Sequence, residues 1–289
     1  MPNLYVFPGG VVEDKVDEKF PVEKTNFSHV KDQPIVMEGH KSDFPFRVAA
    51  LRELFEETGI LFTTDKKSKR REVLTTVKDS KLQEWRDKVR ENPSKFSDLV
   101  SDFRLDLEAL QPWANWLTPV TSKYRYDTLF FVIPVDKEFE VKMCDKEMSE
   151  WLWVTPKEIL ERNCKSEKTG LLPPPQYCEL LRLLNTRFNR LPAMCNPHRL
   201  CPQLIYSKED PGKIYEVLPG DNLYIPENAA YVSARTMNEA DISRSEVTDS
   251  IIHRMTYHEP SFWKLQLHMK NVDRDPEKIR LFHIERTVC

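Results

Sequence analysis

The clearest helical pattern in the chain lies between residues 43 and 58, in the text DFPFRVAALRELFEET. Apolar residues recur there every three or four positions, which predicts a helix with one buried face. Ser42 or Asp43 can cap its start, and Pro45 suits the first helical turn. Gly59 suits the left-handed residue that commonly ends a helix. The pattern therefore predicts a helix over residues 43–58.

Weaker apolar patterns divide the rest of the chain into shorter elements. Those expected before residue 112 are a strand at 4–7, a loop at 11–42, a strand starting within 59–62, and helices at 79–92 and 94–110. Those expected after it are strands within 113–122 and 125–135, a strand that turns into a helix within 150–160, a helix at 173–188, and short strands and turns from 191 on. Pro219-Gly220-Asp221 is typical of a hairpin turn.

The order of these elements indicates the fold class. Strands and helices alternate without a regular βαβ period, which favours an α+β fold or a mixed sheet over a doubly wound parallel sheet. The helices at 79–92 and 94–110 together look like a small helical insertion. The longest apolar run, LFFVIPV at 129–135, is much shorter than the ~18 apolar residues of a membrane helix. We therefore expect no membrane span.

Composition and charge narrow the classes of partner. The chain has 289 residues, 40% of them hydrophobic, so it can bury a sizeable core in one large domain or two modest ones. Its 43 basic and 46 acidic residues give a net charge of −3, and this balance argues against nucleic acid as a partner. The six cysteines match no common zinc spacing, which favours structural or free thiols over a zinc site.

Three glutamates share the polar side of the predicted helix at 43–58. On a helical wheel, Glu53, Glu56 and Glu57 span about 100° opposite the apolar face. Like charges one turn apart repel by a few tenths of a kcal/mol, so the clustering carries a cost. A hard divalent cation such as Mg²⁺ or Mn²⁺ takes oxygen ligands and would give the cluster a purpose. From the wheel alone, however, an ordinary acidic surface face is favoured.

Two short motifs resemble the Nudix box. RELFEETGI at 52–60 is similar to its second half, REUxEExGU with U apolar, and every specified position matches. PGG at 8–10, with Glu13 three residues beyond, resembles its opening half, and EWLWVTPKEIL at 150–160 is similar to a strand and helix entry late in the Nudix fold. The spacing departs from the family pattern, because 41 residues separate Gly10 from Arg52 where the box has thirteen. Phe44 occupies the place of the box's middle glutamate.

An insertion at this point resembles one Nudix branch, the peroxisomal acyl-coenzyme A diphosphatases. Further segments look similar to that branch: WLTP, YDTLFFV, LPPPQ and LPGDNLYI. The resemblance implies a Nudix fold, with a mixed β-sheet between helices in an α/β/α sandwich, a helical insertion and a small C-terminal extension. We expect a Nudix hydrolase domain at 1–190, with insertions at about 14–42 and 63–111, and a β-rich extension at 191–289. The first strand is expected to be truncated, since few residues precede the PGG turn.

The resemblance also implies a reaction and a set of site residues. The reaction is the hydrolysis of coenzyme A or acyl-CoA to 3′,5′-ADP and (acyl-)4′-phosphopantetheine, with Mg²⁺ or Mn²⁺ as cofactor. Glu53, Glu56, Glu57 and the backbone carbonyl of Gly10 match metal-binding positions. Glu53, Glu56 and Arg52 match catalytic positions, Arg52 as the residue that orients a glutamate. Which glutamate is the general base stays open.

Residues outside the box are predicted from chemistry alone. The 3′-phosphate of coenzyme A requires Lys or Arg, and Lys123 and Arg125 precede the YDTLFFV strand. Solvated charges at a strand edge are the alternative interpretation of both residues. Glu147, just before WLW, could be a further base or metal ligand, although a plain surface residue is favoured there.

Two other functions stay open, and so does the compartment. The box indicates diphosphate chemistry, so the substrate could instead be NADH, ADP-ribose or capped RNA, and a non-catalytic Nudix-like binding module is a third possibility. The expected partner is thus a small-molecule diphosphate, while the sequence gives no oligomeric state. The resemblance implies a peroxisomal protein. The final Thr287-Val288-Cys289 is not a serine-lysine-leucine address, so a cytosolic location is the other expectation.

Overall fold

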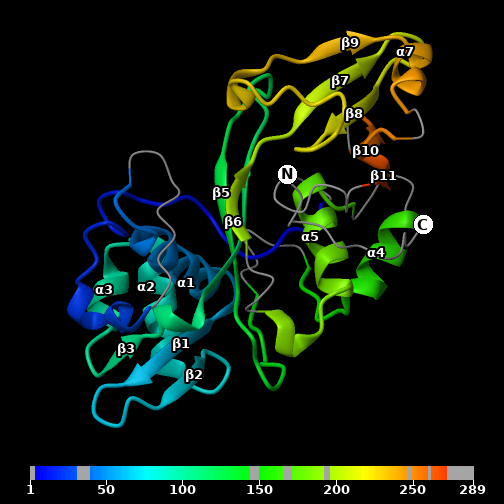
Figure 1. Cartoon of the computed structure of the whole chain (residues 1–289). Helices are drawn as coiled ribbons and strands as arrows, with labels where there is room; N and C mark the ends of the chain where they lie inside the picture. Colours follow the sequence, from blue (N-terminus) through cyan, green and yellow to red (C-terminus); the bar gives the residue numbers. More distant parts are fainter. Residues whose placement is uncertain are drawn as a thin grey trace. The chain divides into compact units, whose positions relative to one another are not determined.

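The computed structural model describes residues 4–30, 40–143, 150–165, 171–191, 196–246, 249–259 and 262–271. The chain divides into two compact units. The α1 unit comprises Phe7–Pro112 and Phe131–Trp153, and the C-terminal unit comprises Met1–Val6, Trp113–Phe130 and Val154–Cys289. Helices, antiparallel strands and parallel strand pairs occur together, which confirms the predicted α+β class (Figure 1).

The α1 unit is built around helix α1 and a three-stranded antiparallel sheet. Its sheet order is β2-β1-β3, so β1 is the central strand. The longer elements are α1 (Phe44–Thr58), β1 (Ile60–Asp65), β2 (Arg71–Thr75), α2 (Ser80–Glu91), α3 (Lys95–Leu99) and β3 (Phe103–Leu105). Three 3₁₀ turns accompany them: η1 (Val22–Lys24), η2 (Phe27–His29) and η3 (Leu107–Ala109).

One hydrophobic core holds the α1 unit together. Phe55 of α1, Leu61 of β1 and Phe96 of α3 are fully buried in this core. Phe20 comes from the segment expected to be a loop, and its ring lies 5.7 Å from that of Phe96. Burying a large apolar side chain stabilises a fold by roughly 1.5–3 kcal/mol, so the core also fixes residues near Phe20.

One sequence prediction in the α1 unit needs correction, and one alternative is decided. The helix expected at 94–110 ends at Leu99, and β3 follows, pairing with β1 through Thr63 and Leu105. This pairing gives the backbone of β3 inter-strand hydrogen bonds that a helix would forgo. At the start of α1, Ser42 Oγ accepts a hydrogen bond from the backbone N–H of Phe44, whereas Asp43 makes no side-chain cap.

The C-terminal unit contains two sheets. Its helices are α4 (Pro156–Lys165), α5 (Pro174–Leu184) and α7 (Glu239–Arg244), with 3₁₀ turns η4 (Phe188–Arg190) and η5 (Ala229–Tyr231). Its strands are β4 (Gln111–Leu117), β5 (Asp127–Val132), β6 (Asn196–Leu200), β7 (Gln203–Ser207), β8 (Lys213–Val217), β9 (Arg235–Met237), β10 (Ile252–His258) and β11 (Trp263–Lys270). The sheet orders are β5-β4-β6 and β11-β10-β8-β7-β9. The chain passes between the two units within β4 and β5.

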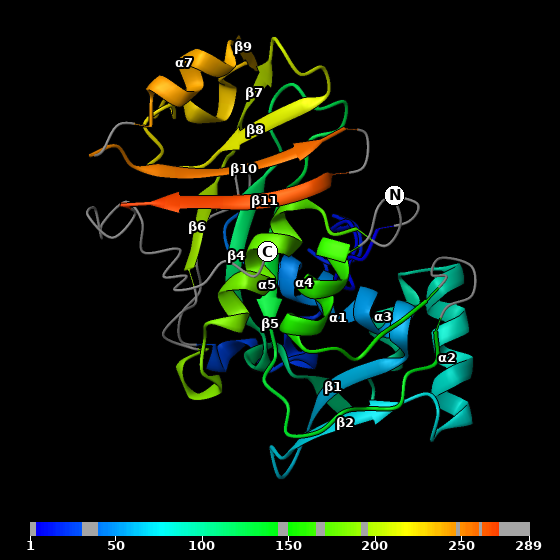
Figure 2. The ribbon, with the colours of Figure 1, turned by 90° about the vertical axis from the view of Figure 1, so that its right-hand side faces the viewer.

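Helix α5 packs on the larger of these sheets. Cys178 Sγ lies 3.3 Å from Met255 Sδ on β10, and Figure 2 shows α4 and α5 beside β10 and β11. Cys178 and Cys201 are buried free thiols, whereas Cys164 is disulfide-bonded. No helix in the described ranges is long and apolar enough to cross a membrane.

Three further predictions fail in the C-terminal unit and its neighbouring segments. Residues 150–154 form no strand before α4, and Leu4 makes only an isolated bridge to Leu171 in place of a strand at 4–7. The turn at Pro219-Gly220-Asp221 does not join a hairpin, because β8 pairs with β7 and β10. In each case the strand or turn was inferred from local composition, while strand pairing is decided by distant partners.

Candidate active site

The carboxylate helix α1 ends in a geometry that only glycine accommodates easily. Gly59 has φ 74° and ψ 12°, and its N–H donates to Phe55 O at 2.9 Å. A Cβ at Gly59 would lie 2.1 Å from Thr76 Oγ1, far inside van der Waals contact. The left-handed turn therefore ends α1 at Thr58 and sends the chain directly into β1.

Arg86 of α2 closes the end of the same helix. Its side chain is buried, and it donates to Glu56 O at 3.0 Å, Glu57 O at 2.8 Å and Lys142 O at 2.5 Å. Two of these are carbonyls of the last helical turn, which lack partners inside the helix. Arg86 therefore fixes the turn that carries two of the glutamates. The helical pattern of 79–92 gives no signal for this role.

The glycine turn lies directly against the acidic face of α1. Gly9 N–H donates to Glu57 Oε2 at 3.1 Å. A Cβ at Gly10 would lie 2.3 Å from the carboxyl carbon of Glu53, so the missing side chain is what permits this close approach. The two motif halves, separated by 41 residues in the sequence, thus meet in space.

Arg52 is the centre of a buried charge network. Its Nε and Nη2 bind Asp17 at 3.0 and 2.9 Å, one nitrogen on each carboxylate oxygen. Its Nη1 donates to Glu53 Oε1 at 2.8 Å and to Glu56 Oε1 at 3.1 Å, while Nη2 also donates to Val11 O at 3.1 Å. These five contacts match the five N–H groups of a guanidinium.

The network gives Arg52 a permanent positive charge inside the protein. The side chains of Arg52 and Asp17 are 1% and 0% exposed, whereas those of Glu53 and Glu56 are 18% and 11% exposed. Burial alone lowers the pKa of Arg52, but hydrogen bonding to Asp17 and the charges of Asp17 and Glu53 outweigh it and raise that pKa. The cation is therefore buried, and the acids that it contacts on α1 face partly outward.

The donor chemistry of this arrangement fits a hard cation. Glu53, Glu56 and Glu57 supply carboxylate oxygens, the ligand type that Mg²⁺ and Mn²⁺ prefer. The absence of a Cβ at Gly10 lets the backbone of the turn approach the Glu53 carboxylate closely. Within the described ranges, no three His, Cys, Asp or Glu side chains are gathered closely enough to hold an ion as they stand. The fit therefore rests on the ligand type and on the close approach of the glycine turn to Glu53.

The predicted substrate residues belong to the C-terminal unit. Arg125 donates to Thr118 O at 3.0 Å and to Ala230 O, and its guanidinium lies 5.6 Å from the centre of the Tyr231 ring. Lys123 Nζ lies 5.1 Å from the ring centre of its neighbour Tyr124. These contacts show local packing of both cations. Glu147 lies outside the described residues.

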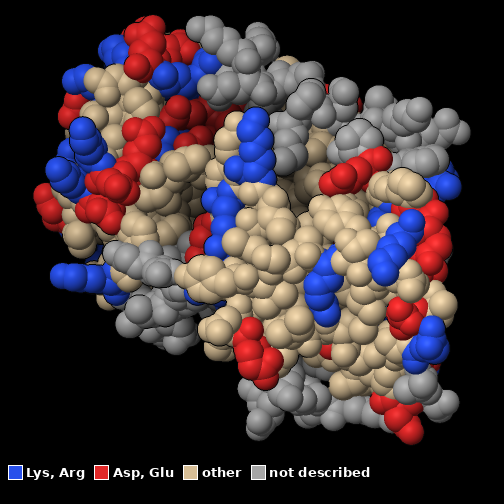
Figure 3. Space-filling model, turned by 90° about the horizontal axis from the view of Figure 1, so that it is seen from above, with Lys and Arg blue, Asp and Glu red and all other residues tan. Residues whose placement is uncertain are grey.

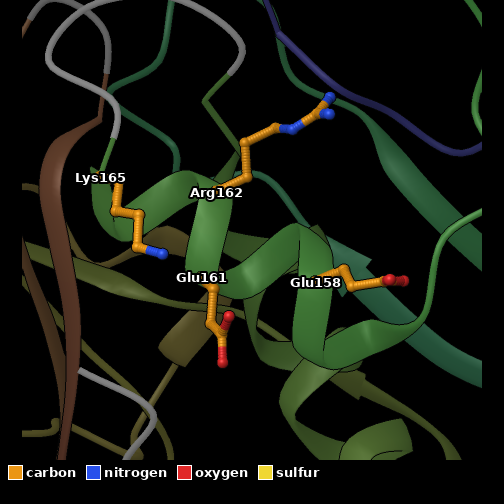
Figure 4. Close-up of a pocket in the computed structure, with 4 residues that line it drawn as sticks. All are labelled: Glu158, Glu161, Arg162 and Lys165. Carbon is orange, nitrogen blue, oxygen red and sulfur yellow. The ribbon is translucent and has the colours of Figure 1, made fainter.

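A hollow on α4 does not form a competing site. A shallow hollow of about 440 Å³ on α4 is lined by Glu158, Glu161, Arg162 and Lys165. Figure 4 shows Glu161 and Arg162 pointing to opposite sides, so the four side chains do not converge on one ligand position. On the face in Figure 3, acidic and basic side chains are interspersed, in agreement with the near-neutral net charge.

Comparison with known proteins connects this geometry to a family. The family described as the NUDT19 Nudix domain matches residues 1–183. A Caenorhabditis elegans protein named as a nudix hydrolase is 32% identical over 286 residues, covering 98% of this chain and 84% of that protein. The Xenopus laevis protein named acyl-coenzyme A diphosphatase NUDT19 is 34% identical over 265 residues, covering 78% of this chain and 68% of that protein.

A solved structure supports the same fold. The crystal structure of a NUDIX hydrolase from Alicyclobacillus acidocaldarius aligns with a TM-score of 0.53 and 23% sequence identity. The alignment covers 68% of this chain and 82% of that protein. Together with the match over residues 1–183, this likeness confirms the fold that the two motifs predict.

Proposed function

Since the chain belongs to the NUDT19 Nudix domain family and is a Nudix-type hydrolase, we propose that it hydrolyses coenzyme A or acyl-CoA. The diphosphate bond would be cleaved by water to give 3′,5′-ADP and (acyl-)4′-phosphopantetheine. Relatives from Xenopus laevis, Gallus gallus and Homo sapiens that carry the name acyl-coenzyme A diphosphatase support this choice of substrate.

One observation carries the proposal within this chain, namely the contact between the glycine turn and the acidic helix. Gly9 N–H binds Glu57, and Gly10 lies against Glu53, although a long insertion separates them in the sequence. This contact brings the glycine turn beside the carboxylates that would hold a cation, as metal-assisted hydrolysis of a diphosphate needs. The contact therefore favours an enzyme over a binding module.

The side chains of α1 would have different roles in the proposed reaction. Glu56 and Glu57 would hold Mg²⁺ or Mn²⁺, with Glu53 and the Gly10 carbonyl as further ligands. When bound, the cation would offset the negative charge of the diphosphate. Arg52, which contacts Glu53 and Glu56 through Nη1, would orient them. Glu53 or Glu56 would accept the proton of the attacking water.

Three finer assignments are part of the proposal. Lys123 and Arg125 would contact the 3′-phosphate that distinguishes coenzyme A from NADH and ADP-ribose.

The Nudix hydrolase domain would extend over residues 1–190, followed by a β-rich extension. The relatives' branch supports a peroxisomal location, which imaging of the tagged full chain would test against a cytosolic one.

A substrate panel tests the proposed function. The protein is incubated with Mg²⁺ or Mn²⁺ and with CoA, acyl-CoA, NADH, ADP-ribose or capped RNA, and products are separated by chromatography. We expect 3′,5′-ADP from CoA or acyl-CoA, and a loss of at least about 100-fold in kcat for Glu57→Gln. Glu91→Gln, which changes an exposed glutamate at the end of α2, is the matched control.

Each outcome of the panel discriminates between functions. Hydrolysis of NADH or ADP-ribose without hydrolysis of CoA would contradict the proposed substrate while keeping the diphosphatase chemistry. No turnover of any diphosphate by a folded protein with either cation would favour the binding module. Full activity in excess EDTA would remove the divalent cation from the proposal.

A further inference from the structure

Arg52 of the acidic helix has a partner that the motif does not predict. Asp17 lies in the segment at 14–42, which the sequence indicates as an insertion without sustained periodicity. The motif's middle glutamate has no counterpart near Arg52 in sequence, because Phe44 takes its place and is buried in the core. The carboxylate that binds the Arg52 guanidinium at two points belongs to Asp17.

The contact between Asp17 and Arg52 is a complete two-point pair. Oδ1 accepts from Nε at 3.0 Å and Oδ2 accepts from Nη2 at 2.9 Å, and both side chains are buried. Such a fork-to-fork pair fixes the plane of the guanidinium as well as its position. The direction in which Nη1 points is therefore set by Asp17.

The position of Asp17 is itself fixed by its own segment. Its N–H donates to Glu13 O at 2.7 Å, and Asp17 Oδ2 accepts from Glu13 N–H at 2.7 Å. Three residues later, Phe20 is anchored in the hydrophobic core. A closed turn on one side and a core anchor on the other hold Asp17 in place, so the pair does not depend on a flexible loop.

The pair restricts how Arg52 contacts the acidic face of α1. Both Glu53 and Glu56 are contacted by the single nitrogen Nη1, through Oε1 of each glutamate. Nε and Nη2 are directed to Asp17 and to Val11 O. Without the Asp17 carboxylate, the same guanidinium could turn more of its donors to the glutamates and compete for their oxygens.

We propose that Asp17 is a positioning residue of the active site, which holds Arg52 so that Glu53 and Glu56 are oriented to bind a divalent cation. This inference rests on the proposed function for its kinetic part, but cation binding can be measured without any substrate. Part of the insertion thereby serves the chemistry of the helix that it precedes. Asp17 acts through Arg52 and needs no contact with the substrate.

The test compares Asp17→Asn with Asp14→Asn, an identical change at an exposed position three residues earlier. Mn²⁺ binding is measured by the loss of the free Mn²⁺ signal in electron paramagnetic resonance, and kcat and KM are measured with CoA. For Asp17→Asn we expect the Mn²⁺ dissociation constant to rise and kcat to fall by about 10–100-fold, with little change in KM. Asp14→Asn should match the parent protein in all three quantities.

Asp17→Glu is the second variant, because it keeps the negative charge and changes the length of the side chain. We expect its Mn²⁺ affinity to lie between those of the parent and Asp17→Asn. If Asp17→Asn lowers only the melting temperature and leaves Mn²⁺ affinity within about twofold of the parent, Asp17 is structural and the inference is wrong. If Asp17→Asn does not fold, Asp17→Glu decides by the same criterion.

The two proposals fail in distinguishable ways. A parent protein that binds Mn²⁺ but hydrolyses neither CoA nor acyl-CoA contradicts the proposed substrate, while the Mn²⁺ measurements still decide the role of Asp17. A parent protein that binds no Mn²⁺ overturns the inference, because there would then be no cation for the glutamates to receive.

Discussion

Two buried aspartate–arginine pairs with nearly identical geometry occur in the two units of this protein. In the α1 unit, Asp17 binds Arg52 through Nε and Nη2 at 3.0 and 2.9 Å. In the C-terminal unit, Asp221 binds Arg254 through the same two nitrogens at 2.8 and 2.9 Å. All four side chains are at most 1% exposed. Burial and two-point geometry therefore cannot tell the pairs apart.

The surroundings of each pair do differ. Asp221 accepts from the backbone N–H groups of His253 and Leu223, both at 2.8 Å, so it ties the turn after β8 to β10. Arg254 also donates to Asn222 Oδ1 at 2.9 Å. Arg52 Nη1 donates to two partly exposed glutamates of α1, at 2.8 and 3.1 Å. Arg254 Nη1 lies 3.6 Å from the exposed Glu246 without a hydrogen bond. A buried aspartate–arginine pair is therefore a candidate for a functional role when the other N–H groups of its arginine bind side chains of a proposed site.

The largest effect on stability is expected at the pair in the C-terminal unit. Asp221→Asn removes the carboxylate that binds the buried Arg254 cation at two points and leaves that cation with the half-exposed Glu246, 3.6 Å from its Nη1. Breaking such a buried pair costs about 3–5 kcal/mol of unfolding free energy. Urea denaturation measures this loss. Mn²⁺ affinity of the folded protein should not change, because Asp221 belongs to the C-terminal unit and ties the turn after β8 to β10.

Asp241→Asn is the control for this experiment, since Asp241 is 44% exposed and pairs with an exposed arginine. Its unfolding free energy should stay within about 0.5 kcal/mol of the parent value. Weakened Mn²⁺ binding in Asp221→Asn would contradict the comparison, because it would give the structural pair the same influence as Asp17.

Glu216 on β8 is a buried carboxyl in the sheet that contains β8 and β10, and it is not paired with an arginine at two points. Burial raises the pKa of Glu216 from its ordinary 4.5 to about 7, and a hydrogen bond with Tyr257 offsets only part of that rise. The Tyr257 pKa is itself well above its ordinary value, through burial and then through the charge of Glu216. Cys178 of α5 also faces Glu216, and its pKa is raised by burial and by neighbouring glutamates.

The raised pKa of Glu216 makes the unfolding free energy decrease as pH rises. Between pH 4.5 and about 7 the folded state keeps the proton that the unfolded state loses, so unfolding free energy falls as pH rises. The destabilising contribution is absent below pH 4.5 and complete above pH 7, where it amounts to about 3 kcal/mol. Glu216→Gln should remove it.

The measurement is urea denaturation of the parent and of Glu216→Gln at pH 5 and at pH 8. The variant should gain about 2–3 kcal/mol relative to the parent between these two pH values. Glu227→Gln is the control, because Glu227 is an exposed glutamate of the same unit. An identical pH dependence in Glu216→Gln and the parent would show that Glu216 titrates as an ordinary carboxyl.

The part of the site carried by local pattern was predictable from the sequence. Helix α1 occupies Phe44–Thr58 against a predicted 43–58, because apolar period, Pro45 and Gly59 all act within a few residues. The meeting of Gly10 with Glu53 was expected only from the motif resemblance. No local signal connects residues so distant in the chain, and the close contact depends on the tertiary fold.

The missed features all depend on distant partners. Asp17 and Arg86 look like ordinary surface charges in sequence, yet both are buried against α1. The helix predicted at 94–110 fails beyond Leu99 because β3 finds a pairing partner in β1. A buried charged residue adds nothing to the periodic pattern of apolar residues in the sequence. Its burial depends on a partner elsewhere in the fold, such as an opposite charge or a free carbonyl group.

The smallest change proposed here adds one methyl group at either of two glycines. A Cβ at Gly10 would meet the carboxyl end of Glu53, a flexible side chain that can move aside. A Cβ at Gly59 would meet Thr76 in a left-handed backbone conformation, where adding a side chain costs about 1–2 kcal/mol. The first change displaces a site carboxylate, and the second strains the end of α1.

We therefore expect Gly10→Ala to lower kcat with CoA, or Mn²⁺ affinity, by about 10-fold or more, with a melting temperature close to that of the parent. Gly59→Ala should lower the melting temperature by a few degrees and leave the Mn²⁺ affinity of the folded protein nearly unchanged. Calorimetry and the Mn²⁺ signal measure the two quantities separately. If both variants lost stability and kept Mn²⁺ affinity, the contact of Gly10 with Glu53 would be a packing feature, and only Arg52 would remain to distinguish the α1 unit from the C-terminal unit.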